Sequence, residues 1–159
     1  MILNILKLIG ITFVPIFELR GSIPFGLFAL KMNWVEVFAI CVTANFVIGI
    51  IVFLFLDFLL KIITRIKFIE SFWSSYIKKT RKKIESSVEK YGEWAVTIFI
   101  GIPLPGSGVW SGALASFLIG LSFKKFIIAD LLGVIIAGIA VTILCLTGSG
   151  LMSIFIKVI

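Results

Sequence analysis

The sequence contains no histidine, only two cysteines and few charged residues. Without histidine the chain lacks the usual general base, the central base of a Ser-His-Asp triad and the commonest metal ligand. Cys41 and Cys145 lie far apart in apolar runs and form no CxxC pair, so we interpret them as small buried apolar residues. These absences exclude most enzymes, and we predict no catalytic residue, no metal and no cofactor.

What the chain has instead is apolar surface. Hydrophobic residues make up 60% of its 159 residues and charged residues only 14%, against about 45–50% and about 25% in soluble domains. A chain of 17.6 kDa with a mean hydropathy of +1.22 is too small to bury that surface inside itself. The composition therefore predicts a single membrane domain over residues 1–159, in contact with membrane lipids.

Most of the positive charge lies in one central segment. The net charge of this segment is +6, because it contains nine basic residues and only three acidic ones, Glu70, Glu85 and Glu89. The basic residues are Lys61, Arg65, Lys67, Lys78, Lys79, Arg81, Lys82, Lys83 and Lys90. The positive-inside rule predicts that this segment is cytoplasmic, and no pattern typical of nucleic-acid binding accompanies the charges. Its apolar residues recur at helical spacing, which predicts an amphipathic helix in the membrane interface, with a solvated linker as the alternative.

Four apolar stretches flank the basic segment. Val37 to Leu56 and Phe126 to Thr147 are each long enough to cross the hydrocarbon core of about 30 Å as one helix. The stretch from Trp94 to Phe123 is interrupted by Pro103-Leu-Pro-Gly-Ser-Gly108, and the first stretch is interrupted between Glu18 and Gly26. Prolines and glycines break helices, so each interrupted stretch is predicted to enter the membrane and return as a re-entrant hairpin.

The basic pair Lys124 and Lys125 favours a hairpin over a crossing. A hairpin returns this pair to the side of the basic segment, whereas a full crossing would violate the positive-inside rule. We thus predict an all-α polytopic membrane protein in the cell membrane, an inverted repeat with both termini external. Its segments are hairpin 1 (1–34), a transmembrane helix (35–60), the basic segment (61–93), hairpin 2 (94–123), a second transmembrane helix (126–147) and a tail (148–159).

A weak internal repeat supports this symmetry. A shift of 89 residues lays Trp34 over Phe123 and Gly49 over Gly138. Inverted repeats with paired broken helices are the architecture of transporters that bind their substrate near the bilayer midplane. The first twenty residues carry Lys7 inside the apolar run and no small-residue cleavage site, so we expect them to remain in the mature protein.

Glu18 and Arg20 are the two charges that we select as candidates for function. At a hairpin tip within the membrane each would be costly unless paired or hydrated, and intramembrane ionisable groups are functional candidates by default. Desolvation favours the neutral carboxyl and Arg20 favours the carboxylate, so Glu18 exchanges a proton only if desolvation dominates. The alternative is a structural clasp. Gly21, Ser22 and Pro24 complete the candidate residues of this tip.

The second tip offers backbone amides where a helix begins again, which is a ready site for an anion. The alternative is that its residues only turn the chain. Asn45, deeper in the membrane, could bond across helices or touch a substrate. Asp57 and Asp130 are secondary candidates, which we expect to be compensated by Lys61 and Lys125 at the cytoplasmic boundary. The candidates of the second tip are Pro103, Pro105, Gly106, Ser107, Gly108, Trp110 and Ser111.

The two motifs, Phe17-Glu-Leu-Arg-Gly-Ser-Ile-Pro24 and Pro103-Leu-Pro-Gly-Ser-Gly-Val-Trp-Ser-Gly112, give the chain its family resemblance. With the basic segment between them, the sequence resembles the small multidrug export family of prokaryotic membrane proteins. That family is distantly similar to DedA and VTT membrane proteins, which implies paired re-entrant hairpins and lipid transport. By this kinship Glu18 and Arg20 match the charged first hairpin, whereas Ser107 and Trp110 stand where the relatives carry arginines.

Three functions follow as hypotheses. The leading one is a transporter that flips or scrambles an amphiphilic lipid phosphate through a midplane site, with or without proton coupling. The second is proton-coupled export of lipophilic cations, which suits the carboxylate and the aromatic residues but is opposed by Arg20. The third is a membrane scaffold without transport. The sequence leaves open the substrate, the coupling ion and whether the chain forms a homo-oligomer.

Overall fold

The structure is a computed structural model that describes residues 2–63, 91–104 and 106–148. These residues form helices and turns, so the predicted all-α class is confirmed for the described part of the chain. Most of the basic segment and nearly all of the C-terminal tail lie outside the described residues. The predicted interfacial helix therefore stays a prediction.

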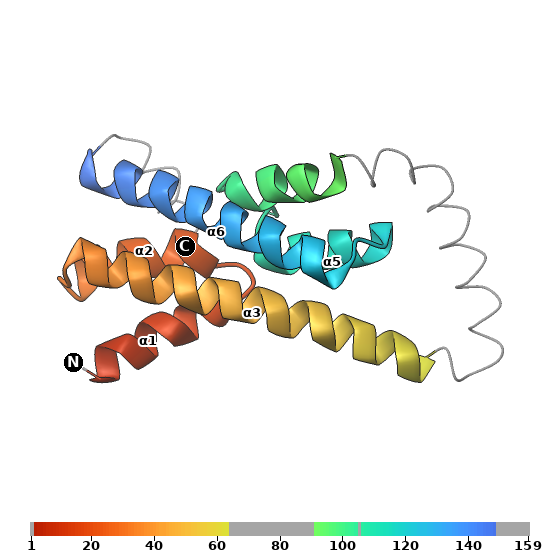
Figure 1. Ribbon diagram of the computed structural model, residues 1–159. Coiled ribbons are helices and arrows are strands. Elements are labelled where there is room, and N and C mark those ends of the chain that lie inside the picture. Colours follow the sequence, from red (N-terminus) through yellow and green to blue (C-terminus); the bar gives the residue numbers. More distant parts are fainter. Residues whose placement is uncertain (1, 64–90, 105, 149–159) are drawn as a thin grey trace.

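The described chain folds into an elongated helical bundle (Figure 1). Two long helices, α3 (Trp34–Ile63) and α6 (Phe123–Leu146), lie side by side and run in opposite directions. The shorter elements pack around this pair. They are α1 (Ile2–Phe13), α2 (Glu18–Pro24), the π-helical turn η1 (Phe25–Ala29), a helix over 91–101, and α5 (Val109–Ile119).

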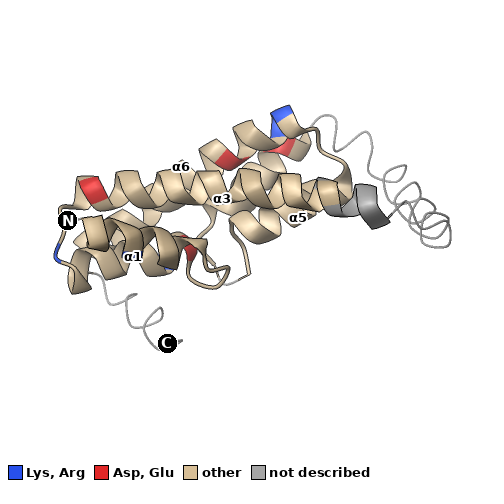
Figure 2. Ribbon diagram, turned by 90° about the horizontal axis from the view of Figure 1, so that it is seen from below, with Lys and Arg blue, Asp and Glu red and all other residues tan. Residues whose placement is uncertain are grey.

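The long helices are also the two segments suited to cross a membrane. Trp34–Leu56 and Phe123–Leu146 are long and apolar enough to do so, and long stretches of both carry no charged residue (Figure 2). At 1.5 Å per residue these 23 and 24 residues span about 35 Å, which exceeds the hydrocarbon core of about 30 Å. Both helices begin three residues before the predicted apolar stretches, α3 at Trp34 instead of Val37 and α6 at Phe123 instead of Phe126.

Two glycines bring α3 and α6 into close contact. A Cβ atom on Gly138 would lie 2.7 Å from Val42 Cγ2, and one on Gly49 would overlap the Asp130 carboxylate. Helices in lipid gain little from burying apolar surface against each other, so close backbone approach at small residues is a main source of their association. Gly49 and Gly138 therefore set the distance between the two long helices.

The first interruption lies earlier than the sequence predicts. We expected the chain to turn between Glu18 and Gly26, but the turn occupies Val14 to Phe17, and Glu18 to Ala29 are helical. Pro15 explains the position of the turn, because it disfavours helical geometry at the preceding residue and lacks an N–H group. The backbone N–H groups of Phe17 and Glu18 both donate to the Val14 carbonyl, at 3.0 and 3.1 Å.

Pro24 changes the helix without ending it. It lies inside α2, and the chain continues as η1, in which Leu30 N donates to the Phe25 carbonyl five residues earlier at 3.1 Å. A proline removes one helical donor, and a local π-turn absorbs the resulting misfit. The glycine and proline residues of the first motif are thus accommodated in helical backbone.

The second interruption covers residues 102–108, where Pro103 and three polar or small residues follow the helix over 91–101. Gly108 ends it with φ 145° and ψ −171°, a backbone conformation that essentially only glycine adopts. Helix α5 then begins at Val109. Gly108 thus fixes the direction in which the first amides of α5 point.

Candidate functional site

The start of α2, which follows the first interruption, meets the second interruption in space. Arg20 Nη1, from α2, donates a hydrogen bond to the carbonyl oxygen of Leu104 in the second interruption. From the same helix, the Glu18 carboxylate accepts the backbone N–H of Val109 at 3.2 Å and that of Trp110 at 3.4 Å. Residues about 90 positions apart in sequence are therefore joined by a set of contacts that we call the Glu18–Arg20 clasp.

Glu18 occupies the backbone amides that the sequence predicts as a possible site for an anion. The first N–H groups of a helix lack partners within the helix and favour a negative charge. At the start of α5 the Glu18 carboxylate, which is 4% exposed, fills that role itself. The fit is tight, because a Cβ on Gly108 would collide with this carboxylate.

Glu18 also has an unusual backbone conformation. Its φ is 42°, in the left-handed region that few residues other than glycine adopt. Such a conformation costs on the order of 1–3 kcal/mol and tends to mark functional sites. The Ser22 hydroxyl donates to the Glu18 carbonyl at 2.8 Å, which helps to hold the carboxylate in place.

A small, partly open cavity, with room for about one water molecule, lies at the clasp. Its polar lining comes from four side chains, Glu18, Arg20, Asn45 and Ser107, together with Pro103 and Gly108. The apolar lining comes from α2, the helix over 91–101, the second interruption and α6, and the sequence analysis singled out none of these residues as a candidate. These apolar residues are Leu19, Ile100, Ile102, Ala137 and Val141.

Two serines hold the second interruption in shape. The Ser107 hydroxyl donates to carbonyls of the turn, at 2.9 Å to Leu104, and accepts the Leu104 N–H at 3.1 Å. The Ser111 hydroxyl donates to the Gly106 carbonyl at 2.9 Å. Both interactions lie within one loop, so they favour the turn-forming role for these two predicted residues.

Asn45 is buried beside the cavity with an unmet acceptor. It is 2% exposed, and its Oδ1 has no hydrogen-bond partner in the described structure. The indole Nε1 of Trp110 is likewise a buried donor without a partner there. Leaving a buried polar group unpaired costs about 1–3 kcal/mol, which indicates that these groups serve something other than stability.

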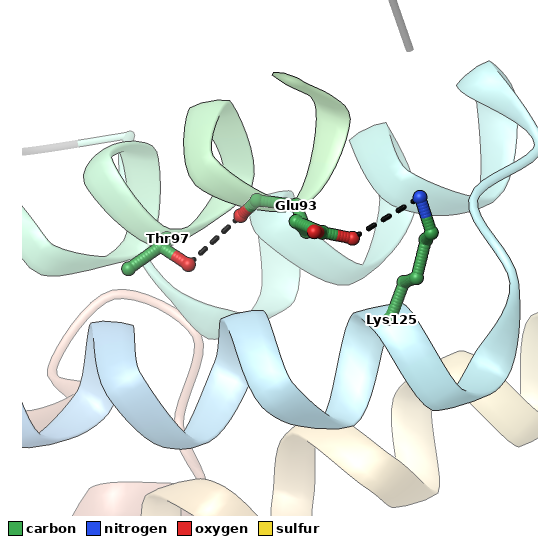
Figure 3. A network of polar contacts seen from close by, with 3 residues as sticks. All are labelled: Glu93, Thr97 and Lys125. Carbon is green, nitrogen blue, oxygen red and sulfur yellow. Dashed lines mark hydrogen bonds and ion pairs between the residues drawn. The ribbon is translucent and has the colours of Figure 1, made fainter. Parts of the chain in front are cut away.

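The expected pairing of Asp130 with Lys125 is wrong. Lys125 Nζ lies 3.2 Å from Oε2 of Glu93, a residue of the helix over 91–101 (Figure 3). The backbone carbonyl of Glu93 also accepts a hydrogen bond from the Thr97 hydroxyl at 2.8 Å. Asp130 is five residues from Lys125, and that spacing turns its side chain to another face of α6. It is 0% exposed, and both of its carboxylate oxygens lack a partner within the described residues.

Three further predicted residues that the structure describes, Gly21, Pro24 and Gly106, do not line the cavity. Gly21 packs on Phe17, where a Cβ would lie 2.7 Å from Phe17 Cβ. Pro24 lies further along α2, and Gly106 is exposed in the second turn. Pro105 and the side chain of Asp57 lie outside the described residues.

The fold and the site together define a class. Two helices that are long and apolar enough to span a membrane contribute to a partly open cavity lined by ionisable side chains, an arrangement typical of membrane transporters. Residues 18–140 match the family model described as "Putative small multi-drug export protein". The chain therefore belongs to the small multidrug export family, and the expected resemblance is confirmed. Comparisons with curated proteins and with solved structures found no match.

The family match adds a class of function to the geometry. Its description is of an export protein, which is a transporter rather than an enzyme. The match runs from Glu18 to position 140 within α6, so it includes the second interruption and every residue that lines the cavity except Val141. The family and the two candidate spans together indicate a membrane location.

Proposed function

We propose that this protein exports amphiphilic cations through the cavity at the Glu18–Arg20 clasp. The observation that carries the proposal is that the hydrogen-bond donors at the clasp already have acceptors within the protein. The groups that would bind an anion are already engaged, because Arg20 donates to Leu104 and the amides of Val109 and Trp110 donate to Glu18. The buried carboxylate of Glu18 is the natural partner for a cation in the adjoining cavity.

The proposed membrane arrangement is an inverted repeat of two re-entrant hairpins. The helix over 91–101 and α5 have eleven residues each, or about 16 Å, which is half of a hydrocarbon core. Cys41 and Asp130, related by the shift of 89, are the eighth residues of α3 and α6, and both are 0% exposed. These equivalences support the repeat, with the basic segment cytoplasmic and both termini external.

The clasp supplies the gate in this proposal. A substrate larger than the cavity enters only if α2 separates from the start of α5, and this movement breaks the contacts of Glu18 and Arg20 together. Glu18 then loses two amide donors, and a bound cation replaces them. Movement of a short helical segment about the turn that precedes it is a common form of such rearrangement.

An anionic lipid is the second candidate substrate. The observation in its favour is that Arg20 lines the cavity and is only partly buried, so its guanidinium can reach a phosphate after leaving the Leu104 carbonyl. This alternative keeps lipid phosphates as partners and makes Arg20, rather than Glu18, the residue that contacts the substrate.

A transport assay separates the two candidates. Purified protein is placed in lipid vesicles, and efflux of ethidium, a lipophilic cation, is measured beside the flipping of a fluorescent anionic phospholipid. Cation export predicts ethidium efflux that is lost in Glu18→Gln and retained in Glu36→Gln, because Glu36 is exposed on α3. Lipid transport predicts flipping that is lost in Arg20→Ala and retained in Lys124→Ala, an exposed cation on α6. Equal ethidium efflux by wild type and Glu18→Gln would overturn the proposal.

A further inference from the structure

Asp130 is the most fully buried ionisable group that the proposed site leaves unexplained. It is 0% exposed on α6, and its carboxylate lies against Gly49 of α3 and beside Val109 at the start of α5. A Cβ placed on Gly49 would collide with both neighbours, so glycine at this position makes room for the carboxylate. The fold thus accommodates a polar group where an apolar one would pack without an unmet hydrogen bond.

The charged groups around Asp130 do not compensate it. From α2, Glu18 is close enough for its charge to repel that of Asp130, and Arg20 donates to Leu104. From α3 the facing residues are Gly49 and, one turn away, Asn45, which are uncharged. The start of α5 contributes Val109, and the nearest basic residue earlier on α6, Lys125, is paired with Glu93 of the helix over 91–101. Ionised, Asp130 would be a buried charge without a partner in the described structure.

Such a charge is expensive. An unpaired carboxylate in a low-dielectric interior costs several kcal/mol, and a buried carboxyl normally becomes neutral instead. Neither oxygen of Asp130 contributes a hydrogen bond to the described fold, so the residue does not stabilise this state. Asn45, with its own unmet acceptor, is a second buried polar group in the same region that has no structural partner.

The charge balance of the buried site links Asp130 to the substrate. Glu18 and Arg20 sum to zero, so the site is neutral when Asp130 carries a proton. A bound monovalent cation raises the charge to +1, and loss of the Asp130 proton returns it to zero. Because net charge in a desolvated site is costly, a proton on Asp130 lowers the affinity of the cavity for the cation, and a bound cation favours loss of that proton.

We propose that Asp130 is the proton-binding residue that couples export of the cation to entry of a proton, an inference that rests on the proposed function. In the closed state Asp130 is a carboxylic acid and Glu18 is held by the amides of α5. When the clasp opens and a cation pairs with Glu18, the O–H bond of Asp130 breaks and the proton passes to the water on that side. Reprotonation from the other side expels the cation, so one proton exchanges for one monovalent cation.

The test separates coupling from substrate binding. Vesicles with an acidic interior are assayed for gradient-driven ethidium uptake, and vesicles without a gradient for exchange of internal against external ethidium. Asp130→Asn has the charge of the protonated state and is expected to bind ethidium more weakly. It should lose gradient-driven uptake to the level of protein-free vesicles while it retains exchange at saturating ethidium, the concentration at which exchange is compared. Glu18→Gln is expected to lose both, and Glu36→Gln neither.

Three outcomes would overturn the assignment or the function beneath it. Gradient-driven uptake by Asp130→Asn equal to that of wild type, or loss of exchange in the same variant, would overturn the coupling role. Absence of both activities in wild type would instead overturn cation export. Infrared spectroscopy of the detergent-solubilised protein at neutral pH separates these cases, because it reports the acid directly. We expect a carboxylic-acid carbonyl band in wild type that Asp130→Asn lacks, and its absence from wild type would refute the protonated state.

Discussion

Glu18 and Asp130 are two buried carboxylates that differ in how the fold treats them. Glu18, on α2, accepts two backbone amides of α5 and has a guanidinium two residues away. Asp130, on α6, has no hydrogen-bond partner in the described structure, and the charge of Glu18 acts on it as a repulsion. The charge of Glu18 is thus compensated in the closed state, whereas a charge on Asp130 would need another state. The comparison separates a residue that holds the site shut from one that responds when it opens.

The largest expected loss of stability comes from a substitution at Gly108, which lies against the Glu18 carboxylate. Gly108→Ala combines a backbone conformation reserved for glycine with a collision against the Glu18 carboxylate. We expect a loss of stability of about 3 kcal/mol or more, because positive-φ strain and displaced packing add. Denaturant unfolding of the detergent-solubilised protein measures this loss.

Gly106→Ala is the matched control for that substitution. Gly106 has φ 87°, but a Cβ on it would meet no atom within 4 Å. Strain alone is expected there, at about 1–2 kcal/mol. Equal losses in the two variants would mean that contact with Glu18 adds nothing to the cost at Gly108.

Removing the Glu18 carboxylate is the next largest change. Glu18→Ala leaves the amides of Val109 and Trp110 without their partner, which we expect to cost about 1–3 kcal/mol. Glu18→Gly separates this loss from backbone strain, because glycine adopts a φ of 42° at little cost. The glycine variant should be more stable than the alanine variant, and the reverse order would show that the backbone at Glu18 is not strained.

Asp130 should respond in the opposite direction. Asp130→Leu replaces an unpartnered buried carboxyl by an apolar side chain with the same branching, so stability should be unchanged or rise by up to about 2 kcal/mol. The same denaturant titration measures it. A loss like that of Glu18→Ala would indicate that Asp130 has a stabilising partner and would abolish the contrast between the two carboxylates.

The smallest effect is expected outside the buried site. Lys125 and Glu93 form an ion pair at 3.2 Å with side chains 40% and 32% exposed. Partly exposed ion pairs contribute about 0–1 kcal/mol to stability. Lys125→Ala should therefore change stability little and transport at the rate of the wild type. A large loss of cation transport in Lys125→Ala would show that this pair, and not the buried carboxylates, governs the site.

Sequence patterns predicted the elements of this fold better than their joins. Length and uncharged runs identified α3 and α6, and Pro103 with its neighbouring glycines identified the second interruption. The first interruption was placed too late, because Glu18, Arg20 and Gly21 look like turn residues in sequence. In the structure their polar groups are satisfied by the other interruption, so helical backbone is tolerated there, and Pro15 alone breaks the chain.

The candidate site was predictable in part for a similar reason. Glu18, Arg20 and Ser107 stood out because charged or polar groups in apolar runs need partners. The apolar lining, such as Ala137 and Val141, carries no such signal. Asp130 was misassigned, because a lysine five residues away in sequence was taken as its partner, and helical geometry points the two side chains in different directions.

By itself, the sequence determined that this is a helical membrane protein of the small multidrug export family with two broken helices and few internal charges. These properties follow from local composition, because lipid excludes charge and proline excludes regular helix whatever the surroundings. Only the tertiary structure decided which groups neutralise one another. It places the Glu18 carboxylate on the amides of α5, and it leaves Asp130, next to Gly49, without a hydrogen-bond partner among the described residues. The physical reason is that pairing depends on distances between segments far apart in the chain.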